Sequence, residues 1–438
     1  MSILPPGFSV SLPSRGSGKH YARNVLEDCG ACVNFVSTTD IDHPSTSWAN
    51  SGLMALTGAT KGFPQICPVP LPDCADDVLE AFRALANIDI LPGVKGSQLL
   101  VERAAITGPQ EIRPTSSGGH CRLLATRNGR IGLNLARDDD WQLLPAWLGV
   151  YDTHDWCAIE SLVATMPTPI LLKQGRLLGL PVVDAASIPT GYCDWVNIAH
   201  RSNAVPARTH APRVLDLSSL WAGPLCSHLW QAAGAHVIKL ESSQRPDGAR
   251  SGALEFFDLL NQGKQSIVLD LHTKAGQREL LELMQHVDIV IEGSRPRALH
   301  QMGIIAEEVI SANPGLSWVS ITGYGRQTPQ SNWTAFGDDA GIAAGLSAIL
   351  FSATGQWSIC GDAIADPLTG LHAALAGWAS WLAGGGHLLD LSLEGTVRHC
   401  ITATSPKDNN YLDRHIRWMK YLQDNQIVAQ TPKRRSGG

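Results

Sequence analysis

The stretch 213–241, RVLDLSSLWAGPLCSHLWQAAGAHVIKLE, decides the fold of this chain. Its apolar start at 213–217 has the length of a strand, and a Gly-Pro turn follows at 223–224. Residues 225–233 have helical length. Gly234 follows them and marks the expected helix end, because glycine commonly stands just past the end of a helix. Residues 237–241 have the composition of a second strand. The stretch therefore predicts one strand–helix–strand unit.

The same alternation continues toward the C-terminus. Strand-like runs recur at 266–270, 287–291 and 316–321, and 276–286 carries apolar residues at helical spacing. Strands separated by helices favour a parallel sheet that is covered on both faces. We therefore expect an α/β protein with a Rossmann-like parallel sheet, helices on both of its faces, and a smaller α+β domain beside it.

Composition places few further limits on the protein. A chain of 438 residues, 44% apolar and 17% charged, can form two or three globular domains. The net charge of -6 gives no reason to expect nucleic acid as a partner. No apolar run reaches the roughly 18 residues of a membrane span, and the N-terminus lacks the pattern of a secretory signal. Ten scattered cysteines suggest reduced thiols, so we expect a cytoplasmic protein.

The first part of the chain resembles parts of the second. The motif GACV at 30–33 parallels GAHV at 234–237, and the stretch 52–58 resembles 344–347. Ile66, Cys67 and Asp73 also align with Ile359, Cys360 and Asp366 at one constant offset, whereas Asp77 stands where the second copy has Gly370. Such self-similarity predicts a degenerate tandem, or a circular rearrangement, of one fold.

These patterns give provisional boundaries. We expect a partial first copy at 1–94, the smaller α+β domain at 95–201, a linker at 202–213 that carries two prolines, and the main domain at 214–400. Residues 401–438 are expected to be a C-terminal tail, ending in the solvated stretch TPKRRSGG.

Seven signals in a fixed order carry a resemblance to a known family. They are VLDLS at 214–218, AGP at 222–224, GAHVIKLE at 234–241, NQGK at 261–264, SRP at 294–296, GYG at 323–325 and ADPLTG at 365–370. In this order the signals resemble the class III CoA-transferase family, which includes formyl-CoA transferase, carnitine CoA-transferase and alpha-methylacyl-CoA racemase. The resemblance implies an acyl-CoA:carboxylate CoA-transferase. Its substrates would be an acyl-CoA and a carboxylic acid acceptor, with no permanently bound cofactor.

The resemblance implies that Asp366 is the catalytic nucleophile. In this family the equivalent carboxylate forms a mixed aspartyl anhydride and then an aspartyl-CoA thioester. A carboxylate suits this chemistry because its acyl derivatives exchange without a metal or redox cofactor. Local sequence alone also fits a helix cap, because Asp366 is followed by a proline. The two roles are compatible.

Six residues are expected to contact CoA. Ala222, Gly223 and Pro224 would offer backbone amides near a helix start. Asn261 and Lys264 lie in a family signal, and Lys264 could meet a phosphate. The guanidinium of Arg295 could bind a phosphate through two hydrogen bonds. The structural alternatives, without a ligand, are a packed turn for 222–224 and surface charges for Lys264 and Arg295.

Several departures keep other functions open. Gly293, Ser294 and Arg297 replace the family's usual residues around Arg295, and Thr328-Pro329 replaces a Gly-Pro, so tight nucleotide binding is in doubt. Racemases of the family use a histidine before their Gly-Leu segment, whereas 336–339 reads FGDD. Asp338 or Asp339 could replace that group. The alternatives are an acyl-CoA racemase or isomerase, or a catalytically reduced CoA-binding subunit.

Three further patterns are discounted. The turn at 221–224 lacks the glycine pattern of nicotinamide dehydrogenases. The CGAC motif at 29–32 has no second ligand pair, and the histidines form no helical pair, so we expect no metal site. The GGGH stretch at 384–387 is expected to be a tight turn. Because the family forms interlocked dimers, we expect either a homodimer or an intrachain pseudo-dimer.

Overall fold

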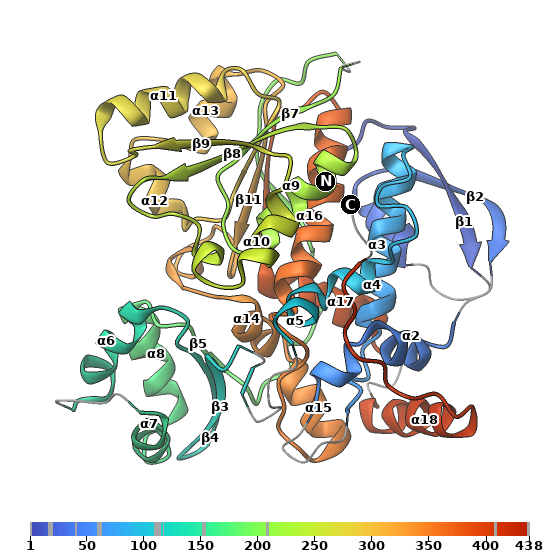
Figure 1. Ribbon diagram of the computed structural model, residues 1–438, viewed down its shortest axis with the longest axis vertical. Coiled ribbons are helices and arrows are strands. Elements are labelled where there is room, and N and C mark those ends of the chain that lie inside the picture. Colours follow the sequence, from blue (N-terminus) through green and yellow to red (C-terminus); the bar gives the residue numbers. More distant parts are fainter. Residues whose placement is uncertain are drawn as a thin grey trace.

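The computed structural model describes residues 2–15, 21–39, 42–58, 64–108, 115–116, 118–150, 155–206, 210–406 and 410–435. It contains one large sheet, a separate lobe with a small sheet, and an N-terminal helical region with a two-stranded ribbon (Figure 1). The expected α/β class is confirmed. Among the described residues, no helix is both long and apolar enough to span a membrane.

The large sheet has seven strands in the order β6-β12-β11-β10-β7-β8-β9. Their bounds are β6 (Asn197–Arg201), β7 (Arg213–Asp216), β8 (His236–Ser242), β9 (Gln265–Leu269), β10 (Ile289–Glu292), β11 (Ser317–Thr322) and β12 (His387–Ser392). Only β6 pairs antiparallel. The six parallel strands follow the chain order 3-2-1-4-5-6, which is the order of doubly wound nucleotide-binding folds.

Helices cover both faces of this sheet. Successive strand residues point to opposite faces, so β10 sends Ile289 and Ile291 into one core and Val290 into another. The first core contains α9 (Ala222–Ala232) and α16 (Ala365–Leu382), and the second contains α11 (Lys274–Met284), α12 (Pro296–Gln301) and α13 (Ala306–Ala312). The doubly covered parallel sheet expected from the strand and helix pattern is therefore present.

The smaller lobe is an α+β unit. Antiparallel strands β3 (Cys121–Thr126), β4 (Gly129–Asn134) and β5 (Val182–Asp184) pack with α6 (Asp138–Leu148), α7 (Trp156–Val163) and α8 (Thr168–Leu178). The lobe has its own apolar core around Trp147 and Leu171. Its sheet also contacts α14 (Gly337–Ala343), where Ile342 lies against Gly132. The lobe is thus fixed to the segment that precedes Asp366.

The N-terminal region repeats the element order of the main domain. Strand β1 (Ser9–Arg15), α1 (Tyr21–Asp28) and β2 (Cys32–Thr39) form a parallel unit, followed by α2 (Pro44–Ser51) and α3 (Leu71–Ala86). An offset of 204 residues, from Gly30 to Gly234, superposes the first unit on β7-α9-β8, and both glycines have positive φ. An offset of 293, from Cys67 to Cys360, superposes α2 and α3 on α14 and α16. Among the described residues of the first copy, no strand corresponds to β9, β10 or β11.

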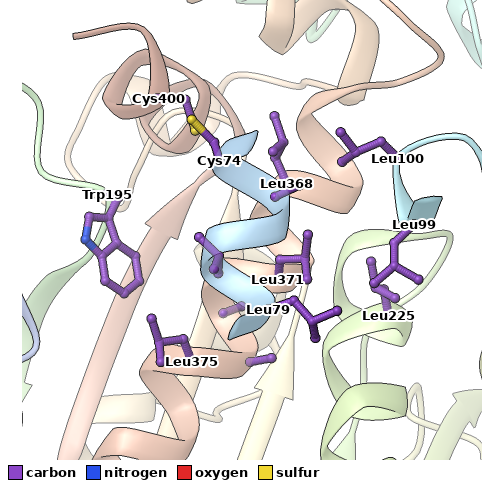
Figure 2. Packing of buried hydrophobic residues seen from close by; sticks show 14 of the residues in the cluster. Cys74, Leu79, Leu99, Leu100, Trp195, Leu225, Leu368, Leu371, Leu375 and Cys400 are labelled. Atoms are coloured by element: carbon purple, nitrogen blue, oxygen red, sulfur yellow. The ribbon is translucent and has the colours of Figure 1, made fainter. Parts of the chain in front are cut away.

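The equivalent parts of the two copies contact each other. Helix α3 packs against α16, and Figure 2 shows Leu79 of α3 beside Leu371 of α16. The thiols of the equivalent Cys67 and Cys360 are hydrogen-bonded to each other. Equivalent elements of the two segments therefore pack against each other.

The expected C-terminal tail at 401–438 is largely helical, whereas Thr431, Lys433 and Arg434 of the stretch expected to be solvated are exposed. Helices α17 (Leu393–Thr404) and α18 (Tyr411–Asp424) occupy much of the region after β12, and α18 buries Trp418 and Leu422. Beyond α18 the chain continues across the protein, and Arg435 is 5% exposed. Its guanidinium lies 3.0 Å from the buried carboxylate of Glu102. An apolar helix face and a buried ion pair hold this segment in place.

Candidate functional site

Asp366 lies in the first turn of α16 and remains partly exposed. The N-cap residue is Ile364, and no side chain caps the helix, so the cap role considered for Asp366 is not observed. Ala363 just before the helix has a φ of 45°, a strained conformation for a residue with a side chain. A Cβ on Gly337 would lie 2.7 Å from Oδ2 of Asp366. Glycine at 337 therefore permits the backbone of α14 to approach the carboxylate.

The surroundings of Asp366 oppose its ionisation. Burial raises the pKa of Asp366 to about 7, and the nearby carboxylates of Asp338 and Asp362 act in the same direction. The positive charge of Arg103 and a backbone hydrogen bond from Gly337 act against this rise. The group therefore changes charge near neutral pH, which is typical of a residue that takes part in chemistry.

Arg103 was not predicted from the sequence. It lies on α5 (Glu102–Thr107), in the first half of the chain, yet it forms two hydrogen bonds with Asp362, four residues before Asp366. The Nε–Oδ2 distance is 2.9 Å and the Nη2–Oδ1 distance is 2.5 Å. The guanidinium also lies 5.1 Å from the ring centroid of Trp221, which precedes α9. No motif surrounds Arg103, so only the fold reveals its position.

Asp338 and Asp339 hold α14 against the site. Oδ1 of Asp338 accepts a hydrogen bond from the backbone N–H of Ala363 at 2.8 Å. Oδ1 of Asp339 accepts from the backbone N–H of Phe336 and from the side chain of Asn134, both at 2.9 Å. Burial raises the pKa of Asp338 to about 6 and that of Asp339 to about 8. These contacts give both acids a structural function.

The predicted turn at 222–224 lies directly beside α16. A Cβ on Gly370 would lie 2.6 Å from the carbonyl oxygen of Ala222 and 3.2 Å from Cβ of Leu225. A Cβ on Gly223 would lie 2.1 Å from Oγ of Ser218. Residues Ala222, Gly223 and Pro224 thus begin α9 one helical turn from Asp366, and the two glycines permit this close packing.

The Lys264 side chain is buried within the main domain beside the partly buried Asn261. Asn261 ends α10 (Leu254–Asn261), and its Oδ1 accepts a hydrogen bond from Nζ of Lys264 at 3.0 Å. The same ammonium contacts Oγ of Ser227 at 2.7 Å and Oδ2 of Asp216 at 3.2 Å. The Lys264 side chain is 1% exposed, and burial lowers its pKa to about 8. This ammonium fastens α9 to the sheet and does not reach a surface where phosphate could bind.

Arg295 lines a basic cleft of about 1040 Å³ between the smaller lobe and the main domain. The charged residues of its lining are the cations Arg137, Lys173, Arg176, Arg295 and Arg297 and the single acid Asp139. Burial lowers the pKa of Arg295, and the positive charges of Arg297 and Arg137 add to that effect. Such crowding of like charge is typical of a site for an anion. Of these five cations, the sequence had indicated only Arg295 as a ligand.

Phe336 and Gly337 lie between the cleft and Asp366, and none of these three residues lines the cleft. The guanidinium of Arg137 lies 5.8 Å from the ring centroid of Phe336. Phe336 directly precedes Gly337, which packs against Asp366. Within the described ranges, no group of three His, Cys, Asp or Glu side chains could hold a metal ion. The site therefore offers a carboxylate at one end and a cationic cleft beyond the 336–337 turn.

The amino-acid sequence is similar to a known family and to two curated CoA-transferases. The sequence model of CoA-transferase family III matches residues 211–409. The chain is 34% identical over 170 residues to a succinyl-CoA--D-citramalate CoA-transferase of Chloroflexus aurantiacus, covering 37% of this chain and 42% of the relative. It is 29% identical over 227 residues to a formyl-CoA:oxalate CoA-transferase of Escherichia coli, covering 48% and 52%.

Two solved structures are similar to part of this chain. Rv3272 of M. tuberculosis is 25% identical, with a TM-score of 0.41 over 47% of this chain and 57% of that protein. A CAIB/BAIF family protein of Brucella suis is also 25% identical, with a TM-score of 0.40 over 53% and 60%. The chain spans about half the length of the curated relatives it matches. On the sequence comparison, residues 211–409 belong to CoA-transferase family III.

Proposed function

We propose that this protein is an acyl-CoA:carboxylate CoA-transferase whose nucleophile is Asp366. The observation that supports this best is a partly exposed carboxylate at the start of α16, in the family segment, packed against Gly337 and faced by Arg103. The relatives are named for transfer between succinyl-CoA and citramalate and between formyl-CoA and oxalate. Here the acyl group and the acceptor are a carboxylic acid pair of the same general kind.

In the first half-reaction an oxygen of ionised Asp366 attacks the thioester carbonyl carbon. The carbon–sulfur bond breaks, and CoA thiolate leaves as an acyl-aspartyl anhydride forms. The thiolate then attacks the aspartyl carbonyl and releases the donor carboxylate, which leaves an aspartyl-CoA thioester. The nucleophile and leaving group exchange without a redox change.

The second half-reaction reverses this order with the acceptor. Its carboxylate attacks the aspartyl-CoA carbonyl, expels the thiolate and forms a new mixed anhydride. Attack of the thiolate on the acceptor's acyl carbon yields the new thioester and frees Asp366. Each step develops an oxyanion, which backbone N–H groups at the start of α9 can stabilise.

The anionic nucleotide end of the CoA thioester is assigned to the basic cleft. Its phosphates need cations with free hydrogen-bond donors, which arginine supplies in a planar fork. Arg295 and Arg297 stand on the main-domain side, and Lys173 and Arg176 on the smaller lobe, whereas Arg137 is already paired with the buried carboxylate of Asp140. Lys264 has no part in this assignment because its charge is already neutralised inside the protein. The thiol end would pass the 336–337 turn to reach Asp366.

The packing of the equivalent helices α3 and α16 supports an intrachain pseudo-dimer with one reactive site. Asp73 occupies the place of Asp366 in the first copy, and burial raises its pKa to about 7. However, the Asp77 carboxylate accepts hydrogen bonds from the backbone N–H groups of Tyr21 at 2.9 Å and Ala22 at 3.2 Å. The helix start that corresponds to the CoA turn is therefore already filled by a carboxylate in the first copy.

Trapping of the acyl-enzyme tests the proposal. The protein is incubated with succinyl-CoA, formyl-CoA and other acyl-CoA donors, quenched with hydroxylamine and digested for mass spectrometry. A hydroxamate on the peptide containing Asp366, absent from Asp366→Asn and present in the Asp73→Asn control, would support the mechanism. Retention of CoA with no modified peptide for any donor would instead favour a CoA-binding subunit.

A further inference from the structure

We propose that Arg103 is a positioning residue that fixes the 362–366 turn and thereby the environment of Asp366, although it lies outside the family segment. The inference rests on the proposed role of Asp366 as nucleophile. It assigns a part in the reaction to the N-terminal half of the chain. Neither the family signals nor the motifs of the sequence include Arg103.

The contacts of Arg103 fix its orientation from two sides. Its two hydrogen bonds to Asp362 use both carboxylate oxygens, a geometry that lysine cannot reproduce. Its guanidinium lies over the Trp221 ring at the start of α9. Asp362 is joined to Asp366 through Ala363, whose positive φ is sustained by neighbouring contacts. Arg103 therefore connects the starts of α9 and α16.

Helix α5 is itself held firmly. Leu99, Leu100 and Val101 before it are fully buried, and Figure 2 shows Leu99 and Leu100 near Leu225 of α9 and Leu368 of α16. The ion pair between Glu102 and Arg435 anchors the same helix from the opposite end of the chain. The Arg103 side chain retains 31% exposure. A fixed base with a partly open guanidinium suits a group that acts beside a substrate.

The charges around Asp366 show why this cation matters. Asp338 on α14 and Asp362 before α16 both face Asp366 and favour its protonated form, whereas Arg103 on α5 favours the ionised form. Without Arg103, three neighbouring carboxylates would share a poorly solvated space. Asp366 would then hold its proton to higher pH, and the fraction available as nucleophile would fall at neutral pH.

The test separates this inference from the proposed function by titrating Asp366 directly. Carboxyl ¹³C NMR of aspartate-labelled protein, with the Asp366 signal assigned by its loss in Asp366→Asn, needs no turnover. For Arg103→Gln we expect the pKa of Asp366 to rise by about one unit or more, the size of shift caused by a close opposite charge. Arg103→Lys should restore part of the difference. The acid limb of kcat/KM should move by the same amount.

Arg83→Gln serves as the matched control. Arg83 also lies in the N-terminal half and donates to the carbonyls of Ile90, Leu91 and Val94, so its loss should lower stability but leave the Asp366 titration unchanged. An unchanged titration in Arg103→Gln would overturn the inference. If Arg103→Gln does not fold, Arg103→Lys is titrated instead. Because lysine cannot reproduce both hydrogen bonds to Asp362, we expect a smaller rise of the Asp366 pKa, and a titration identical to that of the wild type would overturn the inference. A shifted titration without acyl exchange in the wild type would refute the transferase and retain the electrostatic role.

Discussion

Replacement of Gly370 by alanine tests whether close contact between α16 and the start of α9 is essential. An alanine inside a helix is normally more stable than glycine by about 1 kcal/mol. Here the new Cβ would lie 2.6 Å from the backbone carbonyl oxygen of Ala222 and 3.2 Å from Cβ of Leu225. Backbone cannot rotate away, so overpacking of about 1–3 kcal/mol opposes the helix preference. We expect a net loss of up to about 2 kcal/mol.

The matched variant is Gly341→Ala in α14. Its new Cβ would lie 3.0 Å from Cγ2 of Ile364 and 3.6 Å from Cδ1 of Leu346, which are side-chain ends that can move. Urea unfolding should therefore show a lower midpoint for Gly370→Ala than for Gly341→Ala, with unchanged slopes. Because the 222–224 turn must also shift, acyl exchange should fall at least about tenfold in Gly370→Ala, which corresponds to about 1.4 kcal/mol of transition-state stabilisation. A Gly370→Ala protein that is more stable than the wild type and equally active would refute the reasoning.

Three further predictions follow from buried charges. Arg435→Ala leaves Glu102 buried without its cation and should lower the free energy of unfolding in urea by about 3–5 kcal/mol. Lys264→Met removes one of the two cations near Asp216, which keeps Lys239 and its hydrogen bonds from Ser218 and Ser227, so it should cost less, about 1.5–3 kcal/mol. The KM for acyl-CoA of the folded fraction should stay near the wild-type value. Because the folded pKa of Asp339, about 8, lies above its unfolded value, its contribution to stability is present at low pH and is lost as pH rises toward 8. Urea unfolding should then show that the free energy of unfolding of Asp339→Asn increases relative to that of the wild type between pH 5 and pH 9. An equal pH dependence of the two free energies would contradict this.

Local sequence was sufficient for the main sheet. The runs at 213–217, 237–241 and 287–291 each alternate or cluster apolar residues over strand length, and each became a parallel strand in the expected place. The helix between the first two ends next to Gly234, whose φ of 95° explains why glycine stands there. These signals are local because strand length, helix length and positive φ depend on neighbouring residues.

The site depends on contacts that local sequence cannot show. Lysine usually lies at the surface. The Lys264 side chain is nevertheless buried, because Asp216, Ser227 and Asn261 surround its ammonium. Arg103 lies 259 residues from Asp362, and no spacing rule relates the two. The cationic cleft likewise combines the smaller lobe with α12. Pairing over such distances is set by topology, so the motif could indicate Asp366 as the proposed nucleophile but could not indicate its electrostatic partners.

The two copies show how one fold could keep a reactive site and close another. Position 77 in the first copy and position 370 in the second both face the helix that follows the first strand of their unit. In the first copy the Asp77 carboxylate binds the N–H groups at the start of α1, and a carboxylate there is favoured by the helix dipole. In the second copy glycine takes that position, and no side chain caps α9. A helix start without its own anion can accept one from a ligand. The exchange of Asp for Gly is therefore a physical reason to place the proposed acyl-CoA site in the second copy.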